Sequence, residues 1–340
     1  MKAKIFYLIP DIHHNRFNFK HFIKNVLKGN ALVYIKSLGT NDKKAVGGVK
    51  VILQHCLMLR EKGINAYAVH MGQYKGEVFG LDIHYINRHK AKKLIGPDDI
   101  VVASEFAPYD IYDFKSKNNV LFMQSIRAMT RLKEEHKNLN YFQIGFKEVI
   151  TCSDFCTSII RQQMGIEATT ITNGIDTTAF TQNLGLRKEK QVLLLTRKHP
   201  EDVEKIKELS RGRDFNFVTA DGLTQEELVR KYQESDIFVP TGYPEGFGLT
   251  PLEAMLCGCV VVGFTGGGAK EFMIHEQTAL VAEDGNCSQV VRNLDRICKD
   301  NALKEKLREN GRGLAKTYTT ERTSKLLINF YKEKFPDLIN

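Results

Sequence analysis

Two glutamates, Glu245 and Glu253, bracket a glycine-containing turn in the stretch E-G-F-G-L-T-P-L-E. The turn leads into a predicted helix start, because Thr250 is a good N-cap, Pro251 suits the first helical position and Glu253 completes a capping box. A helix that opens from a glycine loop offers unpaired backbone N–H groups and a partial positive charge, which both favour a phosphate. Carboxylates at the rim of such a site can accept hydrogen bonds from sugar hydroxyls.

The same residues also have a purely structural interpretation. Glu253 would then be only a cap, Glu245 a solvated loop acid, and the two glycines only turn formers. An isolated T-P-L-E favours that interpretation, but the complete string is more distinctive. It resembles the Glu-x7-Glu signature of retaining glycosyltransferases of the family-4 type, which have the GT-B fold, including the G-F-G-L between the acids.

The resemblance implies a role for each residue of the string. Glu253 would accept hydrogen bonds from the ribose hydroxyls of a nucleotide, and Glu245 from the hydroxyls of the donor sugar. Backbone groups between the acids would contact the sugar and the diphosphate, and the ring of Phe247 most simply fills the core. These backbone groups belong to Gly246, Phe247, Gly248, Leu249 and Thr250.

Arg197 and Lys198 follow the predicted strand Val192–Leu195, at the carboxyl end where a parallel sheet places its ligands. The family usually has an Arg there and a Lys a few residues later, but this chain has Asp202 five residues after Arg197. Either Lys198 or Lys205 would then supply the second cation. Two fixed cations would offset the charge that builds on the departing nucleoside diphosphate. A solvated pair of loop cations is the structural alternative, which fits Lys198 better than Arg197.

Other glycine-containing stretches extend the resemblance. Gly47 and Gly48 precede a predicted helix and resemble the turn that lets the first strand-to-helix loop approach the donor's phosphates. The stretch Asn173–Asp176 resembles the N-G-I-D that ends the first domain of the family, with its first two residues in a turn. Gly266–Gly268 and Glu271 resemble a segment near the nucleotide, and a structural use of these glycines is the alternative.

One residue that the resemblance implies is missing. Many family members have a His after the strand that corresponds to Val120–Phe122, whereas this chain has Gln124. An amide can position hydroxyls but cannot act as an acid or a base, so a His-dependent step is in doubt while the donor site is not. Ser104 and Glu105 follow the predicted strand Ile100–Ala103 and face the expected cleft, which makes Glu105 a candidate base on the acceptor side.

A larger framework has to position these residues. The chain has 340 residues, more than a single core usually holds, so two domains are expected. Short β-rich runs alternate with helical patterns, which predicts an α/β fold of two Rossmann-like, doubly wound domains. The resemblance to GT-B glycosyltransferases implies that the two domains face a central cleft. The predicted strands are Ile5–Ile9, Ala66–His70, Ile100–Ala103, Val120–Phe122, Val149–Thr151, Val192–Leu195, Phe215–Val218, Ile237–Val239, Val260–Gly263 and Ala279–Val281. The predicted helices are Val49–Lys62, Phe155–Met164, Val203–Leu209, Gln225–Glu234, Leu252–Cys257 and Ser288–Lys299.

The predicted organisation has four parts. Residues 1–176 form an acceptor-side domain, 177–189 a polar linker, and 190–318 the domain that binds the nucleotide sugar. Residues 319–340 form a helix with an apolar stripe, which by the resemblance packs back on the first domain.

Residues 11–44 interrupt the alternation, because a strand-to-helix connection usually has about 2–6 residues. The stretch contains seven Lys and Arg residues against two Asp, interleaved with Phe, Ile, Val and Leu. A basic amphipathic helix here would make peripheral contact with an anionic membrane or bind an acidic acceptor. A surface insertion with solvated lysines is the alternative.

Composition narrows the partners and the compartment. The net charge of +9 suits a polyanionic ligand or an anionic membrane, and no zinc-finger, RRM or basic-helix signature indicates a nucleic acid. No apolar run approaches the ~20 residues that span a bilayer. The seven scattered Cys residues lack the spacing of zinc ligands, which predicts buried thiols in the cytoplasm, or at the inner face of the membrane. The chain has no Asp-x-Asp and no Walker A pattern, so we expect neither a metal cofactor nor an NTPase.

The resemblance implies that the chain moves a sugar from a nucleotide-diphosphate donor to a hydroxyl of a glycan or lipid-linked acceptor, with retention of configuration, in bacterial-type glycan, glycolipid or polysaccharide synthesis. Glu245, Arg197 and Lys198 would be catalytic, and Gly48 and Glu253 would help these three to bind the donor. Two alternatives share the fold: a sugar-nucleotide epimerase, which needs no acceptor, and a non-catalytic subunit. The sequence does not indicate the base, the sugar, the acceptor or the oligomeric state.

Overall fold

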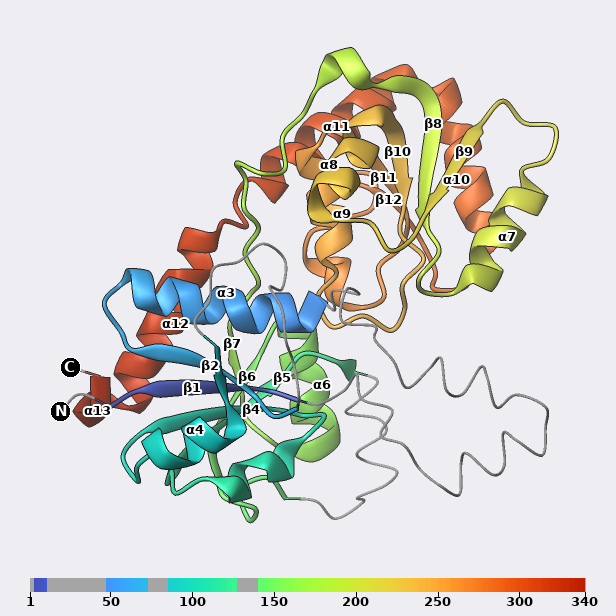
Figure 1. Ribbon diagram of the computed structural model, residues 1–340. Helices are drawn as coiled ribbons and strands as arrows, with labels where there is room; N and C mark the ends of the chain where they lie inside the picture. Colours follow the sequence, from blue (N-terminus) through green and yellow to red (C-terminus); the bar gives the residue numbers. More distant parts are fainter. Residues whose placement is uncertain (1–2, 11–46, 73–84, 127–139, 340) are drawn as a thin grey trace, which may run out of the picture. The chain divides into compact units, whose positions relative to one another are not determined.

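The computed structural model describes residues 3–10, 47–72, 85–126 and 140–339 (Figure 1). The predicted stretch 11–44 therefore lies outside the described residues. Contacts divide the chain into two compact units, one of residues 1–121, 141–147 and 337–340 and one of residues 122–140 and 148–336. The strands of the described ranges form two sheets, of seven and five strands, which confirms the predicted α/β fold with two doubly wound domains.

The seven-stranded sheet has the order β3-β2-β1-β4-β5-β6-β7. Its strands are β1 (Ile5–Ile9), β2 (Ala66–His70), β3 (Tyr85–Asn87), β4 (Ile100–Ser104), β5 (Asn118–Met123), β6 (Phe146–Thr151) and β7 (Thr169–Thr170). The pairings of β1 with β2 and with β4 are parallel, and both begin at Ile5. Strands β1, β4 and β5 are buried along their whole length, as expected for inner strands of a parallel sheet.

Helices α3 (Gly47–Glu61) and α4 (Arg88–Leu94) lie on opposite sides of β1 and β2 in Figure 1. Helix α3 buries eight side chains at helical spacing, among them Val51, Leu59 and His55. Burial lowers the pKa of His55 to about 3, so this imidazole is neutral in the core. Among the described residues, the 3-10 helix η1 (Pro108–Asp113) follows β4, and helix α6 (Asp154–Met164) lies between β6 and β7 in sequence.

The five-stranded sheet has the order β12-β11-β10-β8-β9. Its strands are β8 (Lys188–Leu195), β9 (Asn216–Ala220), β10 (Ser235–Val239), β11 (Val260–Phe264) and β12 (Leu280–Ala282). Strand β8 has β9 on one side and β10 on the other, and both pairings are parallel. The winding of the chain therefore reverses between β8 and β10. In doubly wound sheets, ligands bind at the carboxyl ends of the strands beside such a reversal.

Helices cover this sheet and complete its core. They are α7 (Pro200–Leu209), α8 (Gln225–Glu234), α9 (Leu249–Leu256), α10 (Cys287–Lys299) and α11 (Asn301–Ala315), with η3 (Gly268–Glu271). Val192, Ile237 and Val262 of the strands pack in one buried cluster with Ile206 of α7 and Leu294 of α10. Apolar burial of this kind is the main term that holds such a domain together.

Helix α12 (Thr320–Lys334), which α13 (Pro336–Ile339) follows, is anchored to residues 172–175. The hydroxyl of Thr323 donates to the carbonyl of Thr172 at 2.7 Å, and the Ile175 amide donates to the carbonyl of Tyr318 at 2.8 Å. A Cβ on Gly174 would lie 2.6 Å from the Thr319 carbonyl oxygen. The predicted turn at residues 173 and 174 is therefore wrong, since glycine serves a close approach to α12 here.

The stretch predicted as a linker, residues 177–189, contains the 3-10 helix η2 (Leu184–Leu186) and the start of β8. The predicted domain boundaries stay predictions. In the described part of the chain, no helix combines the length and apolar character needed to cross a bilayer.

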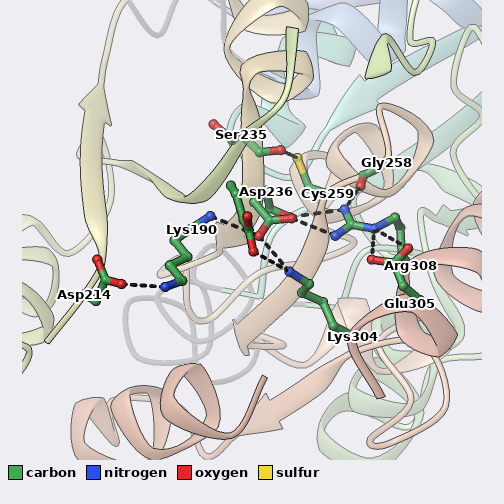
Figure 2. A network of polar contacts seen from close by, with 10 residues as sticks. Lys190, Asp214, Ser235, Asp236, Gly258, Cys259, Lys304, Glu305 and Arg308 are labelled. Carbon is green, nitrogen blue, oxygen red and sulfur yellow. Dashed lines mark hydrogen bonds and ion pairs between the residues drawn. The ribbon is translucent and has the colours of Figure 1, made fainter. Parts of the chain in front are cut away.

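A buried charge network joins α11 to the amino ends of β8 and β10 (Figure 2). The carboxylate of Asp236 accepts hydrogen bonds from Arg308 Nη2 at 2.7 Å, from Lys304 Nζ at 3.4 Å and from the Lys190 amide at 3.2 Å. Arg308 also donates to the Gly258 carbonyl at 2.5 Å. Burial opposes ionisation of Asp236, but the hydrogen bond and charge of Arg308 and the charge of Lys304 outweigh it and lower the pKa of this carboxyl.

We predict that Asp236→Ala destabilises the protein by ~3–5 kcal/mol, because it leaves the buried Arg308 without its carboxylate. Urea unfolding followed by circular dichroism measures the effect. Asp214→Ala is the matched control, since the Asp214 side chain is 87% exposed in its pair with Lys190 and should matter little. Equal effects of the two substitutions would contradict a structural role for the network.

The same network predicts a pH dependence of the free energy of unfolding. Because the folded-state pKa of Asp236 is lowered, its contribution is complete above the unfolded pKa of about 3.9 and is lost as the pH falls towards the folded value. Titration of the unfolding free energy between pH 6 and acid should therefore show a smaller acid loss in Asp236→Asn than in the unaltered chain. An unchanged acid loss would count against this assignment.

Candidate active site

The structure brings together two of the predicted site residues, Lys198 and Glu245. Lys198 lies in the loop after β8 and Glu245 in the loop after β10, and Nζ of Lys198 forms an ion pair with Oε2 of Glu245. Leu194 of β8 is in register with Val239 of β10, so the two loops leave neighbouring carboxyl ends. Both side chains are partly exposed, at 39% and 30%. The pair therefore lies at the topological reversal, where a ligand can reach it.

A second set of contacts, which the sequence did not predict, joins the same two loops. The rings of His199 and Tyr243 stack with their centroids 4.0 Å apart and their planes 2° from parallel. His199 Nε2 lies 2.7 Å from the backbone oxygen of Tyr243, and the hydroxyl of Thr241 donates to the Lys198 carbonyl at 3.2 Å. In the sequence, the only signal for a contact of His199 in the site is its place directly after Arg197 and Lys198.

Asp202, which replaces the Lys that the resemblance implied, also serves this loop. Its carboxylate accepts a hydrogen bond from the Tyr243 hydroxyl at 2.8 Å. Burial, and next the bond to Asp202, raise the pKa of Tyr243 to about 12, so the phenol stays protonated and donates. Lys205 lies exposed on α7, and the structure pairs Lys198 rather than Lys205 with Glu245.

The glycine stretch 266–268 braces Glu245 from another side. The amide of Glu245 donates to the Gly266 carbonyl at 2.7 Å, and the amide of Gly268 donates to the Glu245 carbonyl at 3.1 Å. Gly266 and Gly267 have φ angles of 59° and 96°, in the region that favours glycine. A Cβ on Gly266 would also lie 2.7 Å from the Cβ of Glu245. These glycines are structural in this chain, the alternative considered from sequence.

Gly246 is fixed by its carbonyl group and by a lack of space. Its carbonyl accepts hydrogen bonds from Ser153 Oγ at 2.5 Å and from Cys156 Sγ at 3.3 Å. A methyl group on Gly246 would overlap the backbone oxygen of Gln124. Ser153 is also the N-cap of α6, so one hydroxyl links the start of this helix to residues 242–248, the acidic loop. At the same helix start, the carboxylate of Glu271 accepts a hydrogen bond from the amide of Asp154, the first residue of α6, at 2.7 Å.

The predicted helix start after the first acid is wrong in its detail. Helix α9 begins at Leu249, and its N-cap is Gly248 with φ 91° and ψ 72°. Thr250 and Pro251 therefore lie inside the first turn, and Thr250 forms no cap. Glycine at the N-cap adopts the left-handed backbone that lets the helix begin earlier, and a proline is tolerated in the first turn. The helix start still offers backbone N–H groups to a ligand as predicted, since no side chain caps this N-terminus.

Two other predicted residues of the string, Phe247 and Glu253, are less accessible than Glu245. Phe247 is 3% exposed and packs on Phe272, with centroids 5.4 Å apart, so its ring fills the core as expected. Glu253 is 5% exposed, and the Tyr232 hydroxyl donates to its carboxylate at 3.5 Å. Its role towards a ribose stays a prediction.

Arg197 lies exposed in the loop after β8, one residue before the ion-paired Lys198. Gly48 lies in the first turn of α3, which begins at Gly47, so the predicted glycine turn before that helix is instead its first turn. Gln124 follows β5 and is partly exposed. Glu105, after β4, is buried and accepts a hydrogen bond from Ser104 Oγ at 2.8 Å.

This arrangement offers two kinds of group to a ligand. Arg197, Lys198 and the amino end of α9 suit a diphosphate, and the Glu245 carboxylate suits hydroxyl groups. Within the described ranges, no three His, Cys, Asp or Glu side chains gather as ligands of a metal ion would.

Comparisons with known proteins agree with this chemistry. The family model described as "Glycosyl transferases group 1" matches residues 187–314. An alpha-1,6-glucosyltransferase of Actinobacillus pleuropneumoniae serotype 7 (strain AP76) is 27% identical over 246 residues, which are 66% of this chain and 71% of that protein. The chain spans less of three further curated relatives, 38%, 25% and 23% of their lengths.

Solved structures with similar folds cover nearly the whole chain. HepE of Anabaena, solved in complex with UDP and glucose, has a TM-score of 0.71 at 14% identity and covers 97% of this chain and 100% of its own. Sucrose-phosphate synthase of Thermosynechococcus elongatus has a TM-score of 0.67 at 15% identity, with 99% and 100% covered. The solved structures show the GT-B fold, and the family model and the named relatives show the class. The chain is a glycosyltransferase, and therefore an enzyme.

We predict that Gly246→Ala displaces the acidic loop and destabilises the protein by about 1–3 kcal/mol, the usual cost of overpacking. Thermal and urea unfolding measure this cost. Gly313→Ala in α11 is the matched control, because nothing lies within 4 Å of its Cβ position and alanine favours a helix. The control should be neutral or slightly stabilising, and a Gly246→Ala protein as stable as the control would refute the close packing.

Proposed function

We propose that this glycosyltransferase moves a sugar from a nucleotide-diphosphate donor to an acceptor hydroxyl with retention of anomeric configuration. The observation that carries the proposal is the pairing of Lys198 with Glu245 at the reversal of the five-stranded sheet, next to Arg197. One site then offers cations for a diphosphate and a carboxylate for the hydroxyls of a sugar. A nucleotide sugar combines these two features in one molecule.

The proposed chemistry assigns a task to each group. Arg197 and Lys198 stabilise the negative charge that develops on the leaving nucleoside diphosphate as the bond to the sugar breaks. Glu245 accepts hydrogen bonds from hydroxyls of the donor sugar, and Glu253 from the ribose. When the donor binds, Lys198 exchanges the Glu245 carboxylate for the diphosphate, which leaves Glu245 to the sugar. Backbone groups of Gly246, Phe247, Gly248, Leu249 and Thr250 contact the sugar and the diphosphate in this proposal.

The remaining details are also part of the proposal. With two side-chain cations at the diphosphate, transfer needs no metal ion, so activity should persist in EDTA. The acceptor is a glycan or a lipid-linked molecule, and the reaction belongs to glycan, glycolipid or polysaccharide synthesis. A cytoplasmic location, with peripheral membrane contact through residues 11–44, completes the proposal. UDP-glucose is the first donor to test, because HepE was solved with UDP and glucose and a relative is named a glucosyltransferase.

The nucleotide is the first property to measure. A ligand that binds only the folded state stabilises it by RT ln(1 + [L]/Kd), about 2.7 kcal/mol at one hundred times Kd. We expect one of UDP, GDP, ADP and dTDP to raise the melting temperature, and the Arg197→Ala protein to lose that rise. If none of the four raises it, the proposal fails.

We predict that Arg197→Ala lowers kcat by roughly 10²–10³-fold, the usual effect of losing one group that stabilises developing negative charge. Release of the nucleoside diphosphate with saturating donor and an acceptor glycan present measures the rate. Arg211→Ala is the control, because Arg211 is also exposed but follows α7 at the opposite edge of the sheet. Normal turnover of a folded Arg197→Ala protein would remove Arg197 from the mechanism.

Incubation with the donor alone separates the alternatives that share this fold. An epimerase would convert the donor into an isomer without an acceptor, and a non-catalytic subunit would bind no nucleotide. The proposed transferase needs an acceptor for turnover, and NMR of the product reports the retained anomeric configuration.

A further inference from the structure

The imidazole of His199 occupies the junction between the two loops of the candidate site. It directly follows Lys198 in sequence, and its ring covers Tyr243, which precedes Glu245 by two residues. The side chain of His199 is only 19% exposed. The two loops that carry the ion pair therefore also carry one stacked pair of rings, His199 beside Lys198 and Tyr243 two residues before Glu245.

The contacts of the imidazole hold both the ring and the backbone carbonyl of Tyr243, which lies in the acidic loop. A carbonyl oxygen can only accept, so His199 Nε2 carries a hydrogen and donates to the Tyr243 carbonyl at 2.7 Å. Nδ1 of the same ring lies 2.9 Å from Oε1 of Glu201. Since Tyr243 is two residues from Glu245, a shift of this carbonyl would move the carboxylate.

Tyr243 is held at its other end by the same helix that His199 precedes. Its hydroxyl donates to Asp202 in the first turn of α7, while His199 is the N-cap of that helix. The ring, the backbone oxygen and the hydroxyl of Tyr243 are thus all fixed to residues 199–202. Tyr243 thus attaches the acidic loop to the start of α7. The loop is also held by its contacts with Gly266 and Gly268, by the hydrogen bonds of Ser153 and Cys156 to Gly246, and by the ion pair of Glu245 with Lys198.

The backbone at His199 shows that the ring is held in place by its surroundings. His199 has φ 48° and ψ 57°, a left-handed conformation that few residues other than glycine adopt. Histidine and asparagine adopt it more readily than most. Such a residue persists where surrounding contacts determine its conformation, and these are commonest at functional sites.

We propose that His199 is a positioning residue that sets the place of the Glu245 carboxylate relative to Lys198 and the donor. This inference rests on the proposed function, in which Glu245 binds the donor sugar. His199 itself contacts neither reacting atom in the proposal and acts through Tyr243. The presence of a histidine in this place therefore affects transfer without contributing a proton to it.

The first test needs no ligand. In His199→Ala, hydrogen–deuterium exchange of the peptide covering residues 240–248 should rise several-fold, while exchange in the β10 and β11 strands stays unchanged. His199→Asn should restore part of the protection, because asparagine tolerates the left-handed backbone and its amide can donate to the Tyr243 carbonyl. His275→Ala is the control, since His275 is a half-exposed histidine of the same unit, outside the site. Unchanged exchange in His199→Ala would overturn the proposal whatever the donor is.

The second test is a double-mutant cycle with UDP-glucose as the probe. We expect His199→Ala to lower kcat/KM roughly tenfold, which is the effect expected when one hydrogen bond that positions Glu245 is lost. In a Glu245→Gln background the same change should cost less than about twofold, because its target is already gone. Equal costs in the two backgrounds would show that His199 does not act through Glu245.

The cycle also separates this inference from the proposed function. If Glu245→Gln alone leaves kcat/KM unchanged, the proposed role of Glu245 is wrong. If Glu245→Gln abolishes transfer while His199→Ala leaves it unchanged, only the role of His199 is wrong. Should His199→Ala lower the melting temperature too far for kinetics, His199→Asn takes its place, with a smaller effect in the same direction expected.

Discussion

The candidate site depends on the close approach of the acidic loop to residues 266–268, which leaves no room for side chains at several glycines. The acidic loop at residues 242–248 exchanges backbone hydrogen bonds with residues 266–268, and a Cβ at Gly246, Gly266 or Gly268 would collide with backbone or Cβ atoms. Steric exclusion of this kind leaves the loop one position. That position presents the Glu245 carboxylate to the cation of Lys198, and the chemistry that we propose follows from it.

The two edges of the five-stranded sheet differ in what they do: the amino edge carries a stabilising charge network and the carboxyl edge carries the candidate site. At the amino edge, Asp236 pairs with Arg308 and Lys304 in a buried network that ties α11 to the strands. At the carboxyl edge, the Lys198–Glu245 pair is partly exposed, so a ligand can replace one partner with its own charge. A pair buried like Asp236 could not exchange partners without a large desolvation cost. The solvent exposure of the second pair is therefore a requirement of its proposed function.

Much of this framework was predictable from the sequence. The long apolar runs and the helical periods between them predicted ten strands and the α/β class, because burial on both faces leaves a clear pattern. Strands β3 and β7, of three and two residues, were missed because such short elements carry no period. The start of α9 was missed because Thr250 and Pro251 are typical of a cap and a first helical residue, whereas Gly248, in a left-handed conformation, is the N-cap and starts the helix earlier. Lys198 and Glu245 were predicted to share one site, but their ion pair was not, because the strand order that brings their loops together has no local signal. The stacking of His199 on Tyr243 likewise joins residues 44 apart.

The most direct test of the account is a crystal structure of the protein with an intact nucleotide-diphosphate sugar bound. We expect the sugar hydroxyls within hydrogen-bonding distance of the Glu245 carboxylate, and the diphosphate against Arg197, Lys198 and the first amides of α9. A donor bound with its diphosphate away from these cations, or with its sugar out of reach of Glu245, would contradict the central claim.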